Sequence, residues 1–220
     1  MAVDGGDLRH VRWLGGGSGA GKSTTARRLA AEHDLHLYAT DDVMAEHARR
    51  CPPRRCPQLH AFLAMDEDER WVHRSPEEML ETFHWFRGEA FDLVVEDLLA
   101  LPADRGVLVE GFRLLPHLVA PLLSAPRQAV WLLPTPQFRR AAFEARGGLW
   151  QIAGRTGDPP RALANLLERD RLFTDHLRRE THRCGLAAVE VGTGLGEPGL
   201  ARLVADALGL PAGPRPRTSP

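Results

Sequence analysis

The sequence predicts an α/β fold in which a five-stranded parallel sheet is covered by helices on both faces. Two observations carry this prediction. Short apolar runs alternate with longer segments of helical periodicity along the chain. The 220 residues, 43% of them hydrophobic and 26% charged, are also enough to bury one sizeable core. We therefore expect a single domain over residues 1–210 and a Pro-rich, disordered tail at 211–220.

Five apolar segments are expected to form the strands, at residues 10–14, 35–39, 107–111, 129–133 and 187–191. In open parallel sheets, ligands bind beyond the carboxyl ends of the strands. Polar residues stand at or just after four of the predicted strand ends, namely Lys22, Asp41, Glu110 and Thr193. The topology therefore predicts that residues far apart in the sequence converge on one crevice.

The predicted helices are one after residue 23, a short one at 43–50, and others at 75–99, 116–123, 135–146, 160–183 and 197–208. Ser75, Pro76 and Glu78 give the helix at 75–99 a strong start, with a capping serine, proline in the first turn and a capping box. We expect this helix to continue past Gly88 with at most a bend. The residues between 146 and 160 are rich in glycine and arginine and are expected to be irregular.

Residues 16–23 match the motif G-x-x-x-x-G-K-[ST] in full. In such a loop, glycines let successive backbone N–H groups surround phosphates, and the following helix adds its positive end. Lys22 is the only lysine in the chain. Apart from the histidines, every other basic residue is an arginine. We expect Lys22 to reach the β- and γ-phosphates of ATP or GTP and Ser23 to offer its hydroxyl to Mg²⁺. The expected nucleotide-binding residues of this loop are Gly16, Gly17, Ser18, Gly19, Ala20, Gly21, Lys22, Ser23 and Thr24.

Composition and charge exclude several classes of partner. The formal net charge is −1, which gives no chain-wide attraction to nucleic acid or to an anionic membrane. No segment approaches the roughly 20 apolar residues of a membrane helix, and the start of the chain does not resemble a signal peptide. A cytoplasmic protein without membrane or nucleic-acid partners is therefore expected, as a monomer or homodimer. Guanine-specific GTPases read their base with Asn-Lys-x-Asp, and the single lysine excludes that motif.

In its loop and its order of elements the chain resembles the small P-loop kinases, a group that includes adenylate, shikimate and gluconate kinases and chloramphenicol phosphotransferase. The resemblance extends over residues 11–208, and only the loop is a specific motif. It implies the P-loop NTPase fold and an enzyme that moves the γ-phosphate of ATP or GTP to a hydroxyl group of a small molecule. It further implies an acceptor-binding insertion at about 43–100 and an arginine-rich lid at about 139–157.

The resemblance also suggests roles for individual residues. Asp41 would be the general base, with Asp42 as its alternative, and Glu110 would position the acceptor or bind Mg²⁺. Arg146 would act on the transferred phosphate and Arg155 on the nucleotide, with Arg169 and Arg171 as substitutes. The remaining assignments are Thr193 and Gly194 near the adenine, and His84 and Arg87 at the acceptor.

Several alternatives remain open at this point. A nucleoside or nucleotide kinase would need a basic acceptor site, for which Arg49, Arg50, Arg54 and Arg55 are available. A nucleotide-binding regulatory module without transfer activity would need no base. The spacing of His47, Cys51, Cys56 and His60 suggests a zinc site, or otherwise a surface loop with free thiols. Three cysteines, an odd number, argue against a disulfide framework.

Overall fold

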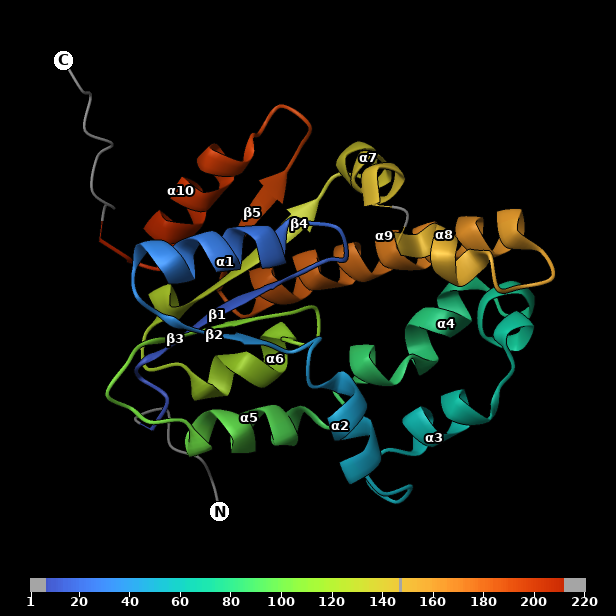
Figure 1. The fold of residues 1–220 in the computed structure, drawn as a ribbon, viewed down its shortest axis with the longest axis horizontal. Coiled ribbons are helices and arrows are strands. Elements are labelled where there is room, and N and C mark those ends of the chain that lie inside the picture. The colour runs from blue at the N-terminus through green and yellow to red at the C-terminus, as the bar shows by residue number, and fades with distance from the viewer. Residues whose placement is uncertain (1–6, 147, 212–220) are drawn as a thin grey trace.

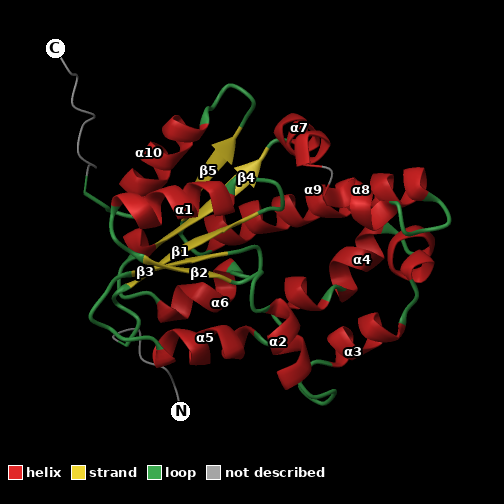
Figure 2. Cartoon of the chain, viewed as in Figure 1, coloured by secondary structure: helices red, strands yellow, loops and turns green. Residues whose placement is uncertain are grey.

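The computed structural model describes residues 7–146 and 148–211. At its centre is a five-stranded sheet in which every neighbouring pair is parallel, in the order β2-β3-β1-β4-β5 (Figures 1 and 2). The strands are β1 (Val11–Gly16), β2 (His36–Ala39), β3 (Val107–Glu110), β4 (Ala129–Pro134) and β5 (Ala187–Val191). The predicted α/β class and the five-stranded parallel sheet are thus confirmed. Because β1 pairs with both β3 and β4, the segment that follows it leaves the middle of the sheet.

Helices cover both faces of this sheet, as predicted (Figure 1). One face packs against α1 (Lys22–Glu32) and α10 (Glu197–Ala207). The opposite face packs against α5 (Phe91–Ala100), α6 (Pro116–Val119) and the long α9 (Pro159–Arg183). Short 3₁₀ turns at η3 (Ala120–Leu122) and η4 (Pro126–Gln128) connect α6 to β4, and α7 (Pro136–Arg146) follows β4.

The alternation of side chains along the strands produces these two layers. Trp13 and Trp131 are fully buried among the side chains of α5, α6 and α9. Leu14 and Leu132, the next residue of each strand, are fully buried on the side of α1 and α10. Both faces of a parallel sheet must be covered, which is why its strands are continuous apolar runs. Burying an aromatic side chain of this size contributes roughly 4–6 kcal/mol to folding.

Between β2 and α5 the chain forms a set of short helices beside the sheet (Figure 1). They are α2 (Met44–Arg50), α3 (Pro57–Ala64), a π-helical turn η1 (Glu69–His73), α4 (Pro76–Thr82) and a 3₁₀ turn η2 (His84–Arg87). Two small apolar clusters hold them in place, one around Trp71 and Met79 and the other around Leu59 and Trp85. The first cluster includes residues of α8 (Gly148–Ala153) and α9, so this insertion is attached to the second half of the chain.

The structure corrects two of the expected elements. The helix expected at 75–99 is divided into α4, η2 and α5, although Ser75 caps its start by accepting the N–H of Glu78 as expected. Gly88 and Ala90 interrupt it with left-handed backbone, at φ 79° and 58°. The stretch expected to be irregular after residue 146 contains α8 instead.

Among the described residues, none of the helices is both long enough and apolar enough to cross a membrane. Of the tail at 211–220, all but the first residue lies outside the described residues.

Candidate functional site

The Gly-rich loop joins β1 to α1 at the carboxyl edge of the sheet. Gly16, Gly19 and Gly21 have positive φ angles of 136°, 74° and 82°. A side chain at Gly16 would collide with the backbone of Leu132 on β4, so this position also requires glycine for space. The Nζ of Lys22 donates a hydrogen bond of 2.9 Å to the carbonyl of Gly17. The loop therefore bends around the ammonium group of Lys22.

The start of α1 can receive an anion. Its N-cap is Gly21, so no side chain caps the first turn, and the first turn contains no acidic residue. The N–H groups of a first helical turn have no partners within the helix, and the helix dipole adds partial positive charge there. Together with the ammonium of Lys22, these groups form a site that can bind a phosphate or another anion.

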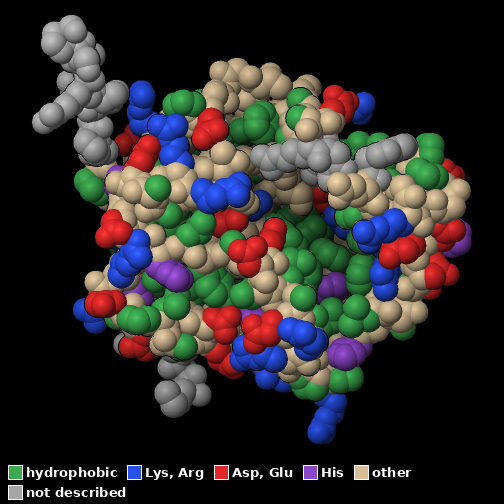
Figure 3. Space-filling view, in the orientation of Figure 1, with side chains coloured by type: hydrophobic (Ala, Val, Ile, Leu, Met, Phe, Trp, Pro, Cys, Tyr) green, Lys and Arg blue, Asp and Glu red, His purple; other side chains and the backbone are tan. Residues whose placement is uncertain are grey.

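A cavity of about 320 Å³ lies against the loop. Residues from both halves of the chain line it: Ser18, Gly19, Ala20, Gly21, Lys22, Ser23, Asp41, Trp71, Phe83, Phe86, Phe112, Ile152, Arg169 and Asp170. The face shown in Figure 3 is hollowed between the sheet and the short helices of the insertion, and hydrophobic side chains gather in the hollow. The lining thus combines the polar backbone and charges of the loop with aromatic side chains.

Asp41 follows β2 and is the one acidic residue among those expected at the acceptor that lines this cavity. Asp41 as a whole residue is exposed. Nearby protein atoms nevertheless displace water from its carboxyl group, and this desolvation raises the pKa of that group. Lys22 and Arg113 oppose this effect, whereas Asp42 adds to it. A carboxylate with a raised pKa near an anion-binding loop is suited to accept a proton. Asp42 is exposed and does not line the cavity.

Glu110, at the end of β3, lies behind the loop and is only 3% exposed. Burial raises the pKa of its carboxyl group, while Lys22 and a hydrogen bond with Ser23 act in the opposite direction. Its Oε2 is buried and has no hydrogen-bond partner within the described part of the chain. An unpaired carboxylate oxygen beside a serine hydroxyl suits Mg²⁺, which prefers oxygen ligands and retains several waters. Over residues 7–146 and 148–211 no three acidic, cysteine or histidine side chains form a metal cage.

The arginine that lines the cavity is Arg169 on α9, which the sequence offered only as a substitute. Its Nε and Nη2 donate hydrogen bonds of 3.0 and 2.7 Å to Oδ1 of Asp170. Asp170 is fully buried, and its Oδ2 has no hydrogen-bond partner among the described residues. Arg139, at the start of the predicted lid, is buried beside Thr174 and donates a hydrogen bond to its hydroxyl. The side chain of Arg146 lies outside the described part of the structure, and Arg155 is exposed after α8 and does not line the cavity.

Other expected site residues do not line this cavity. His84 is buried against Phe62, Phe83 and Trp85, and burial together with Arg113 lowers its pKa to about 3. Arg87 is exposed and lines a different surface depression. Thr193 and Gly194 are exposed in the loop after β5, two strands from β1.

The residues that the sequence did not assign to the site include Phe112, Ile152 and Asp170. Of these three residues, only Phe112 could have been assigned to the site from the sequence, because it follows Glu110 at the end of β3 by two residues. Phe83 and Phe86 both pack in the core and line the cavity.

The predictions of a zinc site and of a surface loop with free thiols were both wrong. Cys51 and Cys56 form a disulfide, so neither thiolate is available to a metal. Both cysteines are buried beside Leu59 and Trp85, which explains why they meet in spite of the polar sequence between them. The Nε2 of His60 bonds to the carbonyl of Cys51, and His47 is engaged elsewhere.

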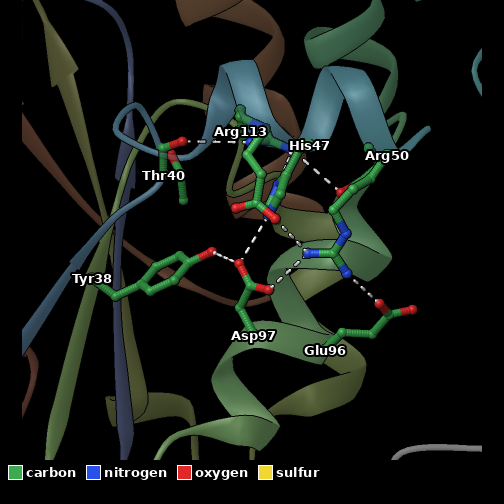
Figure 4. Close-up of polar contacts among 9 residues, drawn as sticks. Tyr38, Thr40, His47, Arg50, Glu96, Asp97 and Arg113 are labelled. Atoms are coloured by element: carbon green, nitrogen blue, oxygen red, sulfur yellow. Dashed lines mark hydrogen bonds and ion pairs between the residues drawn. The ribbon is translucent and has the colours of Figure 1, made fainter.

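A polar network joins Thr40, the residue before Asp41, to α2 and α5 (Figure 4). Arg113 donates to the carbonyl of Thr40 at 3.5 Å and to Nδ1 of His47 at 3.2 Å. Arginine can only donate hydrogen bonds, so Nδ1 of His47 must accept the bond from Arg113. The Nε2–H of His47 then donates to Asp97 at 2.9 Å. The hydroxyl of Tyr38 donates to the same carboxylate oxygen at 2.6 Å. The network therefore ties the segment before Asp41 to α2 and α5.

No protein-family model matches the chain, and no curated protein is similar to it. Among solved structures, an uncharacterized protein from Eubacterium ventriosum is similar, with 12% sequence identity and a TM-score of 0.48. The similarity covers 90% of this chain and 97% of that one. A likeness at this level says nothing about what either protein binds.

Proposed function

We propose that this protein is a small-molecule kinase of the P-loop NTPase fold, which transfers the γ-phosphate of ATP or GTP to a hydroxyl group. The observation that carries the proposal is one shared cavity. It is lined by the Gly-rich loop with Lys22, by the carboxylate of Asp41 and by apolar side chains. A phosphate donor and an alcohol acceptor would thus meet within reach of Asp41.

In the proposed step, the acceptor oxygen attacks the γ-phosphorus and a new O–P bond forms. The bond between the γ-phosphorus and the β–γ bridging oxygen breaks, and the nucleoside diphosphate leaves with that electron pair. The hydroxyl proton passes to the carboxylate of Asp41, which later releases it to water. Lys22 and the backbone N–H groups of the loop stabilise the phosphate charge, and Arg169, which is paired with Asp170, adds positive charge to the same cavity.

Ser23 and Glu110 are the residues that would hold Mg²⁺ on the donor side. The ion would supply charge neutralisation on the phosphate oxygens. The unpaired Oε2 of Glu110 gives a reason for this assignment that does not depend on the motif.

A nucleotide kinase finds less support, because an anionic acceptor needs arginines at the acceptor end. Arg50 is instead paired with Glu46, Glu96 and Asp97 on the outside of the insertion, and Arg55 is paired with Asp92. None of the four arginines at 49, 50, 54 and 55 lines the cavity.

The proposal is tested with radiolabelled ATP and GTP, Mg²⁺ and a panel of alcohols, with hydrolysis in the absence of an alcohol as the baseline. Lys22→Ala should abolish transfer with the fold intact, because it removes the charge beside the transferred phosphate. Asp41→Asn should bind nucleotide normally but turn over roughly 10²–10⁴-fold more slowly. Asp42→Asn is the matched control and should behave as wild type. Equal turnover in wild type and Lys22→Ala would overturn the proposal.

A further inference from the structure

Part of the cavity lining is a wall of aromatic rings. Trp71 comes from η1, Phe83 from the junction of α4 and η2, and Phe112 from the segment after β3. Phe83 and Phe112 are half-buried, and their rings are nearly parallel, at 21° with centroids 6.5 Å apart. The indole N–H of Trp71 donates to Glu67, which does not line the cavity. This wall consequently offers ring carbon and no hydrogen-bonding group of its own.

The charges along the cavity leave the acceptor end without a spare cation. Among the described residues, the cationic lining side chains are Lys22 and Arg169. Lys22 belongs to the loop, and Arg169 is paired with the buried carboxylate of Asp170. The guanidinium carbon of Arg169 also lies 5.1–5.4 Å from the centroids of the Trp71, Phe83 and Phe86 rings, so its charge is already in contact with that wall.

Of the two described acidic side chains that line the cavity, Asp170 is paired with Arg169, which leaves the carboxylate of Asp41 to act on an acceptor. A carboxylate or phosphate on the acceptor would be repelled by Asp41 and would find no unpaired arginine among the lining residues. The carboxylate of Asp41 accepts hydrogen bonds and cannot donate one while it is ionised. The polar groups thus favour hydroxyl donors, and the aromatic wall favours a flat apolar group.

We infer that the acceptor is an uncharged alcohol with an aromatic ring, which packs on Trp71, Phe83 and Phe112 while its hydroxyl faces Asp41. This inference rests on the proposed phosphotransfer and narrows its substrate class. Ring stacking supplies affinity without charge, and the distance from the wall to the loop sets which hydroxyl is phosphorylated.

The test measures binding rather than transfer, so that it fails independently of the proposed function. Three alcohols of similar size are titrated by ligand-observed NMR, with and without a non-hydrolysable ATP analogue. They are 2-phenylethanol, its saturated counterpart 2-cyclohexylethanol, and the anionic 4-(2-hydroxyethyl)benzoate. We expect 2-phenylethanol to bind several-fold more tightly than either of the others, and Phe112→Leu to weaken its binding about three- to ten-fold.

Phe138→Leu is the matched control, because Phe138 is also half-buried. It packs against the apolar cluster on the side of α1 and α10 and does not line the cavity. This variant should bind 2-phenylethanol as wild type does. The inference is overturned if the saturated or anionic alcohol binds as well as 2-phenylethanol, if Phe112→Leu binds it unchanged, or if none of the three binds under either condition. Urea unfolding of both variants establishes that they are folded. If 2-phenylethanol binds through Phe112 but Lys22→Ala has normal turnover, the phosphotransfer is wrong and the aromatic site stands.

Discussion

Replacing Asp97 with alanine should lower the free energy of unfolding by about 2–4 kcal/mol, whereas Glu96→Ala should change it by less than about 0.5 kcal/mol. The two residues are neighbours on α5, and each makes an ion pair with Arg50, at 3.3 and 3.0 Å (Figure 4). A count of ion pairs would therefore treat them as equal. They differ in what else their carboxylates bind and in how far those partners are buried.

The larger loss follows from the partners of Asp97. Its carboxylate accepts the Nε2–H of His47, a side chain with 0% exposure, and an orphaned buried donor costs about 1–3 kcal/mol. The lost bond from the half-buried hydroxyl of Tyr38 adds about 0.5–1.5 kcal/mol. Arg50 adds almost nothing, because its exposed guanidinium keeps Glu46 and Glu96.

Equilibrium unfolding in urea, followed by circular dichroism, measures both variants against wild type. For a chain of this size, a loss of 3 kcal/mol corresponds to a fall in the melting temperature of roughly 6–12 °C. The reasoning is refuted if Asp97→Ala and Glu96→Ala lose equal amounts, since burial of the partner would then not determine the cost. Tyr38→Phe gives an internal check and should cost about 0.5–1.5 kcal/mol.

Three further results are expected. Gly16→Ala should destabilise the fold by more than about 2 kcal/mol, because its methyl group would collide with the backbone of Leu132 at a residue with positive φ. The same change should prevent nucleotide binding. Thermal unfolding would measure the loss of stability, and calorimetry would measure the loss of binding. Burial raises the pKa of Asp97, but hydrogen bonds from its partners outweigh this and leave the pKa lowered. Its stabilisation is therefore present above the unfolded-state pKa of about 3.9 and lost as pH falls through the lower folded-state value, so the gap between wild type and Asp97→Ala should close in acid. Cys51→Ala with Cys56→Ala should cost about 2 kcal/mol, the expected worth of so short a loop, and dithiothreitol should destabilise wild type but not this double variant.

The sheet could be predicted because its signals are local. Each strand is an apolar run between breaking residues, and alternation with helices leaves little freedom in how parallel strands are connected. The glycine motif was equally local, and its strand and helix were where the sequence indicated. The helix expected at 75–99 was wrong because the apolar periodicity continues through Gly88 and Ala90, whereas the backbone is left-handed at both residues. A side chain at Gly88 would come within 2.5 Å of Leu118.

The far side of the candidate site could not be predicted, because it is made by contacts between distant segments. Arg169 and Phe112 come from different halves of the chain, and nothing in the spacing says that both reach the loop. Arginine is so common in this sequence that residue type did not distinguish Arg169 from Arg146 or Arg155. The disulfide was missed for a related reason, since an odd cysteine count says nothing about a pair brought together by burial.

Phe83 is the residue through which packing and recognition are coupled. It contacts the main core, the cluster around Trp71 and the cluster around Leu59, and it also lines the cavity. A substitution at Phe83 would loosen the junction between sheet and insertion as well as remove part of the aromatic cavity wall, so its effect on binding could not be assigned to contact alone. Phe112 lacks the contact with the Trp71 cluster and is attached to the rigid end of β3. A change in acceptor affinity at Phe112 with an unchanged unfolding midpoint therefore reports on the cavity wall itself.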